Sequence, residues 1–521
     1  MKRRNFLAGA AASAGALVPT PASAQDGTQL DVSAAVARIR ASIPSNFDRE
    51  YVERVVIPFM LTNIYVDGRP ALPMIDTLLS KENALPKDLF GLVYKKWTPS
   101  PDEGVTVFLQ ALENRGDNNL RKRIYFSAVT PDLYGPMYHD KVVAFFDHLL
   151  DNQYAGKPLM RHYLDYYFDL YWDLHVGVKG KAIPQEVRQL GESFNTVLAY
   201  RNPMEQTVYQ NYKTVRAQMD FLEAWIDRRV GDVSSGRIAN PEKTFVYYWL
   251  KNAGNGDHFS KKDIIFECFH NFVAFSQWGN SIFGIVSRLS PDRGDAAVRA
   301  SFAQTMSGDY DNPNGTPYTP LELFVMELFR TISPNGGSLS AVEDARQPTF
   351  YGKSPHELLG LPAEQYNYVS TPHKATSMAP MHWQDPTQFK PDRYRSVPTS
   401  DQIDEAKIRQ IGLARCPFEI TSLKVSDGRN AELKNSGFGT VFGVVDGKPL
   451  PVCDYAGFAP FGFGYRRCPG EQLTIMVMVD FLRKVWHDKI VFEKLNLPNP
   501  GKVPIGPNAV IEDDIGFSRR V

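Results

Sequence analysis

A single cysteine in a glycine-rich stretch near the C-terminal end constrains this chain more than any other feature. The stretch reads Phe461-Gly462-Phe463-Gly464-Tyr465-Arg466-Arg467-Cys468-Pro469-Gly470-Glu471. Apolar residues then recur at four-residue spacing from Leu473 to Val485, which predicts a buried helix that begins near Gly470. Cys468 therefore lies at a helix N-terminus, where unpaired N–H groups and the helix dipole favour a negatively charged sulfur.

The residues around this cysteine indicate a flat, iron-containing ligand. Gly464 lets the backbone approach such a ligand closely, and Arg466 is placed to pair with an anionic group on it, such as a haem propionate. The stretch resembles the haem-binding loop of the cytochrome P-450 family, Phe-x-x-Gly-x-Arg-x-Cys-x-Gly. The resemblance implies that Cys468 ligates the iron of haem b (iron protoporphyrin IX), with Phe461, Gly464, Arg466 and Gly470 binding the cofactor. The alternative is a buried structural cysteine in a glycine-rich turn.

The first residues resemble a bacterial twin-arginine export signal. A basic Lys2-Arg3-Arg4 precedes a short apolar run over 8–18 and the cleavage motif Ala22-Ser23-Ala24. We therefore expect residues 1–24 to be a signal peptide and the periplasmic protein to be one haem-thiolate domain over 25–521. The alternative is an uncleaved amphipathic anchor. No later run reaches transmembrane length, so we expect no transmembrane anchor after cleavage.

The composition argues against nucleic acid as a partner. Lys+Arg and Asp+Glu both total 58, so the chain has no net positive charge that would attract nucleic acid. Hydrophobic residues make up 43% of the chain, which supports a sizeable core.

Besides Cys468 there are three cysteines. In an oxidising compartment Cys416 and Cys453 could form a disulfide, but their spacing in the sequence does not decide whether they do.

Helical apolar spacing dominates the middle of the chain, over 137–150, 159–176, 211–229 and 262–287. An aromatic stripe within the second of these is expected to be mostly core. Together with the resemblance, this predicts a mainly α fold with small β-sheets, the cytochrome P-450 fold.

Two further motifs resemble that family. Glu327 and Arg330 lie on one face of a helix opened by Thr319-Pro320, like the family's Glu-x-x-Arg pair. The segment 385–394 resembles the family's meander, which implies that Arg393 completes a structural Glu327–Arg330–Arg393 cluster. The family also places a basic residue on the haem propionates, and Arg123 matches that position best.

Residues 396–457 depart from the family pattern. Strand-like runs at 418–425 and 440–445, separated by turn-rich segments, predict an inserted β-containing flap before the haem loop. We expect this flap on the thiolate side, where it could obstruct the docking of redox partners.

The long helix over 262–287 is the one expected to cross the haem on the side opposite the cysteine. Its central run, 269–281, lacks the acid–alcohol pair that delivers protons in oxygen-activating members. Asn280, with Gln277 and Ser281, is the expected lining of this distal side. The run from His270-Asn271 to Asn280 resembles the allene oxide synthase and hydroperoxide lyase branch. The alternative is an ordinary packed helix with polar residues at helix contacts.

The leading hypothesis is a haem-thiolate oxidoreductase that uses or rearranges a peroxide, such as a fatty-acid hydroperoxide, on an apolar, lipid-like substrate. No flavin or iron–sulfur segment is present, which favours a reaction without a reductase. The first alternative is a conventional O₂-dependent monooxygenase served by a periplasmic electron donor. The second is a non-enzymatic haem protein that senses a ligand.

Overall fold

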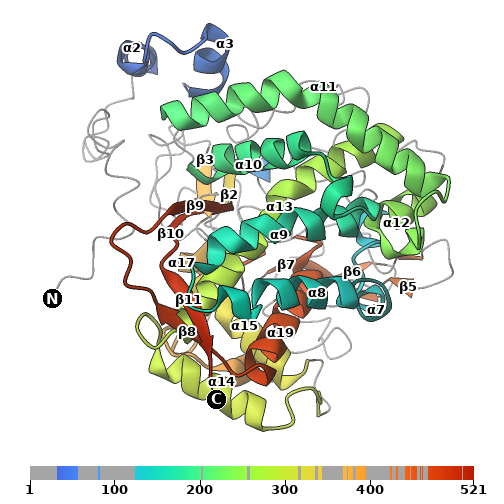
Figure 1. Ribbon diagram of the computed structural model, residues 1–521, viewed down its shortest axis with the longest axis vertical. Helices are drawn as coiled ribbons and strands as arrows, with labels where there is room; N and C mark the ends of the chain where they lie inside the picture. The colour runs from blue at the N-terminus through green and yellow to red at the C-terminus, as the bar shows by residue number, and fades with distance from the viewer. Residues whose placement is uncertain are drawn as a thin grey trace.

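The computed structural model shows a predominantly helical molecule with small β-sheets at its edges (Figure 1). It describes residues 32–56, 80–81, 124–200, 204–254, 259–314, 318–334, 338–342, 368–371, 373–378, 383–394, 423–424, 430–431, 440–445, 448–454, 458, 460–461, 468–506 and 509–520. The expected signal peptide and Cys416 lie outside these ranges. Within them, no helix combines the length and apolar character that a bilayer crossing requires.

From α7 to α15 the helices follow one another along the chain with short connections. The described helices are α2 (Val32–Ser42), α3 (Arg49–Tyr51), α7 (Pro131–Leu133), α8 (His139–Leu149), α9 (Leu159–Val176), α10 (Gln185–Tyr200), α11 (Gln206–Ser234), α12 (Phe245–Asn252), α13 (Lys261–Leu289), α14 (Ala296–Ser307), α15 (Pro320–Ile332), α17 (His373–Ser377) and α19 (Glu471–His487). The predicted boundaries of α9 are confirmed to the residue, and α11 and α13 are longer than predicted at both ends.

All described strand pairs are antiparallel. One sheet has the order β1-β2-β3, and the others are the pairs β4–β5, β6–β7, β8–β11 and β9–β10. The strands are β1 (Ser80–Lys81), β2 (Ser338–Val342), β3 (Tyr368–Thr371), β4 (Leu423–Lys424), β5 (Asn430–Ala431), β6 (Thr440–Val445), β7 (Lys448–Asp454), β8 (Ile490–Lys494), β9 (Lys502–Gly506), β10 (Ala509–Glu512) and β11 (Ile515–Arg519).

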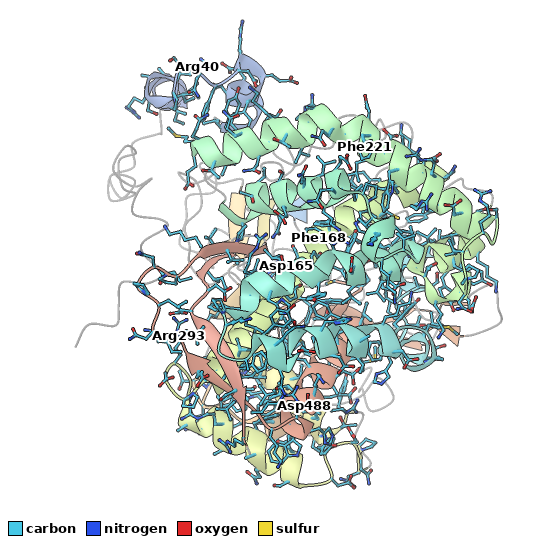
Figure 2. All side chains as sticks on the ribbon, in the orientation of Figure 1. Arg40, Asp165, Phe168, Phe221, Arg293 and Asp488 are labelled. Carbon is cyan, nitrogen blue, oxygen red and sulfur yellow. The ribbon has the colours of Figure 1, made fainter. Side chains whose placement is uncertain are left out.

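The centre of the molecule is a bundle of α8, α9, α13 and α19. Phe146 of α8 packs on Phe481 of α19 with ring centroids 5.2 Å apart. The aromatic stripe of α9 is confirmed as core, because Tyr167, Phe168, Tyr171 and Trp172 are all buried. Figure 2 shows Phe168 within the body of the molecule and Phe221 on the outer helix α11, where it is 39% exposed.

Capping groups explain where three of these helices begin. Ser260 and Asp263 form a reciprocal capping box on α13, and Thr319 and Glu322 form the same arrangement on α15. The start of α9 is capped from far along the chain: the Asp513 carboxylate accepts hydrogen bonds from the N–H groups of Met160 at 2.9 Å and Arg161 at 2.6 Å. The C-terminal strands are thereby fixed to the central bundle.

A buried ion cluster connects α15 to the segment 383–394. The Glu327 carboxylate accepts two hydrogen bonds from the Arg330 guanidinium, at 2.7 and 2.8 Å, and two from Arg393 Nε, at 3.1 and 3.2 Å. The Tyr394 hydroxyl and the Lys390 N–H donate to the same carboxylate at 2.7 and 2.9 Å. Glu327 and Arg330 are both 0% exposed, and these donors compensate the cost of burying their charges.

The segment 396–457 contains β-strands, as expected. In the described part of 396–457 the chain forms the pairs β4–β5 and β6–β7, and β6 matches the predicted strand at 440–445. Cys453 pairs in register with Val441 in the β6–β7 hairpin. Its disulfide with Cys416, and the position of the insertion relative to the cysteine loop, stay predictions.

Replacing Glu327 with Gln should lower the free energy of unfolding by about 3 kcal/mol or more, because it leaves two buried guanidinium groups facing an uncharged amide. Urea denaturation followed by far-ultraviolet circular dichroism measures this change. The matched control is Glu53→Gln, which breaks an equally bidentate but exposed pair with Arg40. Its denaturation midpoint should hardly move, since water solvates and screens both charges. Equal shifts in the two variants would contradict a special role for the buried cluster.

Candidate functional site

Cys468 lies where the sequence predicts, two residues before Gly470, the N-cap residue of α19. It is half-buried, and its N–H donates to the Phe461 carbonyl oxygen at 2.9 Å. A Cβ atom on Gly470 would lie 3.6 Å from the sulfur, so the thiol rests beside the first turn of the helix. The exposed N–H groups and the dipole of this turn favour the thiolate form.

Aromatic side chains connect this loop to the ion cluster. Phe461 packs against Phe329 of α15 and Phe458, with ring centroids 5.1 and 6.5 Å apart. Phe458 meets the ring of Tyr394 edge-on at 5.8 Å, and the Tyr394 hydroxyl donates to Glu327. The buried ion cluster around Glu327 therefore positions Phe461, whose carbonyl oxygen accepts the hydrogen bond from the Cys468 N–H.

The second described free cysteine, Cys268, has a different environment. It is fully buried in α13, and burial, together with the charge of Glu267, raises the pKa of its thiol well above the usual value. Cys268 is therefore a protonated, unreactive thiol, whereas Cys468 is half-buried at a helix N-terminus.

Three predicted cofactor-binding residues, Arg123, Gly464 and Arg466, lie outside the described residues. The predicted structural residues Glu327, Arg330 and Arg393 are brought together in the ion cluster described above.

The predicted distal residues are also brought together, but against a strand. Asn280 Nδ2 donates to Gln277 Oε1 at 2.9 Å, and the Ser281 hydroxyl donates to the Gln277 carbonyl oxygen at 2.9 Å. A Cβ atom on Gly506 of β9 would lie 2.9 Å from Asn280 Nδ2, and one on Gly279 would lie 2.5 Å from a β9 carbonyl oxygen. This face of α13 therefore packs tightly against β9.

A different face of α13 turns towards the cysteine helix. Trp278 Nε1 donates to Thr474 Oγ1 at 3.0 Å, and Thr474 is in the first turns of α19. At about 100° per residue, Asn271 lies within about 20° of Trp278 around the helix axis, and Asn280 lies about 160° away from it. Asn271 and Trp278, rather than Asn280, are the residues on the α19-facing side.

A buried chain of polar side chains leads from this face. The Tyr125 hydroxyl donates to Asn271 Oδ1 at 3.0 Å, and Asn271 Nδ2 lies 3.1 Å from His175 Nε2. His175 Nδ1 lies 2.8 Å from the Tyr171 carbonyl oxygen. Burial lowers the pKa of His175 to about 3, so its imidazole is neutral at ordinary pH.

Tyr125, at one end of this chain, is a protonated phenol. Its pKa is raised well above its usual value, mainly by burial, with smaller electrostatic contributions from Glu267 and Cys468. Sequence reasoning noted Asn271 but missed Tyr125 and His175, because these partners are separated from it by 146 and 96 residues.

These residues fit a thiolate-bound haem. Cys468 is a half-buried sulfur at the positive end of α19, and the aromatic rings of Phe329 and Phe461 supply an apolar wall beside its loop. Within the described ranges, no group of three His, Cys, Asp or Glu side chains could hold a metal ion instead. Cys468 would hold the iron, and Phe461 would pack near the macrocycle.

Comparison by sequence finds no matching family model and no matching curated protein. Comparison of structures finds solved relatives over most of the chain. Cytochrome P450 CYP102L1 matches at 15% identity and a TM-score of 0.53, covering 87% of this chain and 89% of that protein. A variant of cytochrome P450SP alpha (CYP152B1) matches at 14% and 0.52, covering 84% and 86%.

A third match is a variant of cytochrome P450 OleT in complex with arachidonic acid. It shares 13% identity at a TM-score of 0.53 and covers 86% of this chain and 87% of that protein. These identities are low, but each match covers more than four fifths of both chains. The chain has the cytochrome P450 fold, and the strands β4 to β7 precede its cysteine loop.

Proposed function

We propose that this protein is a haem-thiolate oxidoreductase of the cytochrome P450 family, with Cys468 as the ligand of haem b. The observation that carries the proposal is a half-buried cysteine at the N-terminus of α19 in a chain with this fold. A thiolate-held haem supplies an iron centre at which O–O bonds are cleaved. The protein's own contribution is to hold the sulfur through Phe461 and the ion cluster.

The proposed oxidant is a peroxide. In the run 269–281, the α19-facing side carries the amide Asn271 and the indole Trp278, while Asn280 is bonded to Gln277 and the single hydrogen of Ser281 is bonded to a helix carbonyl. None of these side chains can deliver protons as a carboxyl group does. A substrate that already contains an O–O bond avoids the need for two external electrons. The arachidonic acid bound by the OleT variant supports a fatty-acid hydroperoxide, or a fatty acid oxidised by a peroxide, as the substrate class.

A conventional monooxygenase is the second candidate, and one observation favours it. Glu267 is a fully buried carboxyl group one helical turn before Asn271, on the side of α13 that faces Tyr125. A carboxyl group in this position could transfer protons during oxygen activation. This candidate requires a separate electron donor. Because we expect the folded protein to be exported to the periplasm, that donor would have to be a periplasmic one.

Replacing Cys468 with Ser should abolish the absorption spectrum that a thiolate gives to the reduced carbon monoxide adduct of the haem protein, because a hydroxyl group does not replace thiolate at iron. The matched control is Cys268→Ala, which removes the buried, protonated thiol and should leave that spectrum unchanged. An unchanged spectrum in Cys468→Ser would contradict the proposed ligand.

The purified holoprotein should convert a fatty-acid hydroperoxide, such as that of linoleic acid, without any reductant, because the substrate supplies the O–O bond. Product formation is followed by mass spectrometry, with Cys468→Ser and free haemin as controls. Turnover that occurs only with a reductase, NADPH and O₂ would instead identify the monooxygenase.

A further inference from the structure

The side chains of the buried ion cluster carry two positive charges and one negative charge. One carboxylate, Glu327, pairs with the guanidinium groups of Arg330 at 2.7 Å and Arg393 at 3.1 Å. The Tyr394 phenol is neutral, because burial and the charge of Glu327 raise its pKa well above the usual value. Backbone carbonyl oxygens accept further hydrogen bonds from both guanidinium groups, but they carry no net charge. A surplus positive charge therefore lies among buried side chains.

A tryptophan ring lies against this surplus charge. The Cζ atoms of Arg330 and Arg393 lie over the Trp383 ring, 5.9 and 5.5 Å from its centroid. At both distances the negative face of an aromatic ring attracts a cation, and an indole attracts it more strongly than a phenol or a phenyl ring. Trp383 is 8% exposed, and removal from water strengthens such an attraction. The ring face therefore offsets part of the charge that Glu327 does not neutralise.

Hydrogen bonding does not explain why this position carries an indole. Among the residues that the structure describes, none accepts a hydrogen bond from the buried Trp383 Nε1. A buried N–H without an acceptor destabilises the folded state, and a phenylalanine at this position would avoid that cost. The Tyr394 ring meets the indole edge-on, with centroids 5.6 Å apart and planes at 84°. The indole thus lies against all three of the side chains that donate to Glu327.

The same side chains lead to the cysteine. Tyr394 packs on Phe458, and Phe458 packs on Phe461. The Phe461 carbonyl oxygen accepts the Cys468 N–H at 2.9 Å. On the basis of the proposed function, we propose that Trp383 is a positioning residue for the thiolate ligand. The attraction of its ring face for two guanidinium groups fixes the ion cluster, and the ion cluster holds the cysteine loop.

Tryptophan analogues separate this attraction from packing. Fluorine atoms withdraw negative charge from the face of an indole and change its size little, so difluorotryptophan and tetrafluorotryptophan are introduced at position 383 alone by nonsense suppression. Two rates are measured on the holoprotein in a fixed concentration of urea. One is the rate at which the reduced carbon monoxide adduct loses its thiolate spectrum, and the other is the rate at which far-ultraviolet circular dichroism is lost.

The rate of thiolate loss should rise with each step of fluorination. It should rise about twofold to thirtyfold from the wild type to Trp383→Leu, the range expected for loss of a cation–π contact. The rate of helix loss should rise less, because a loosened ion cluster releases the cysteine loop before the helices unfold. The fluorinated proteins keep the test decisive even if Trp383→Leu does not fold.

The matched control is Trp172. This tryptophan is 1% exposed and also has no described acceptor for its Nε1, but its ring packs on the aromatic rings of Tyr171 and Trp225. Fluorination at position 172 should leave both rates nearly unchanged, and Trp172→Leu should raise both rates equally.

Three results would overturn the role of Trp383. They are rates at position 383 that do not depend on fluorination, an equal rise of both rates there, and the same dependence on fluorination at position 172. Absence of a thiolate spectrum from the wild-type holoprotein would overturn the proposed function, and the positioning role with it. A normal wild-type spectrum combined with rates that ignore fluorination would overturn only the role of Trp383.

Discussion

The buried carboxylate of Glu327 is the point on which the rest of the site depends. Its two oxygens receive hydrogen bonds from two guanidinium groups, a phenol and a backbone N–H, contributed by α15 and by residues 390–394. The same phenol, Tyr394, packs on Phe458, and Phe458 on Phe461, whose carbonyl holds the Cys468 N–H. The sulfur is thus positioned by a charge that contacts neither it nor a substrate.

Local features were predictable from sequence because they depend on neighbours in the chain. The boundaries of α9, the capped start of α15 and the strand β6 follow from apolar spacing, Thr319-Pro320 and a run rich in β-branched residues. The pairing of Glu327 with Arg330 follows from their spacing on one helix, while Arg393 required the resemblance of its segment to a known motif.

The orientation of α13 was not predictable in the same way. This helix is buried on nearly all sides, so its apolar pattern has no solvent face from which to infer the direction of each residue. Its orientation is set by Gly279, which admits β9 on one side, and by Trp278, which reaches α19 on the other. Asn280 therefore lies against a strand, and Asn271 acquires partners from α9 and residue 125 that no local pattern reveals.

The cap on α9 has a consequence for how the protein is made. Among the residues that the structure describes, the side chain that caps the first turn of this central helix is Asp513, which lies far along the chain from it. During synthesis α9 leaves the ribosome hundreds of residues before its cap exists, so the bundle that surrounds the cysteine helix cannot be completed co-translationally. Formation of this capped bundle therefore waits until residue 513 has been synthesised, and removal of residues 512–521 would leave the first turn of α9 without this cap.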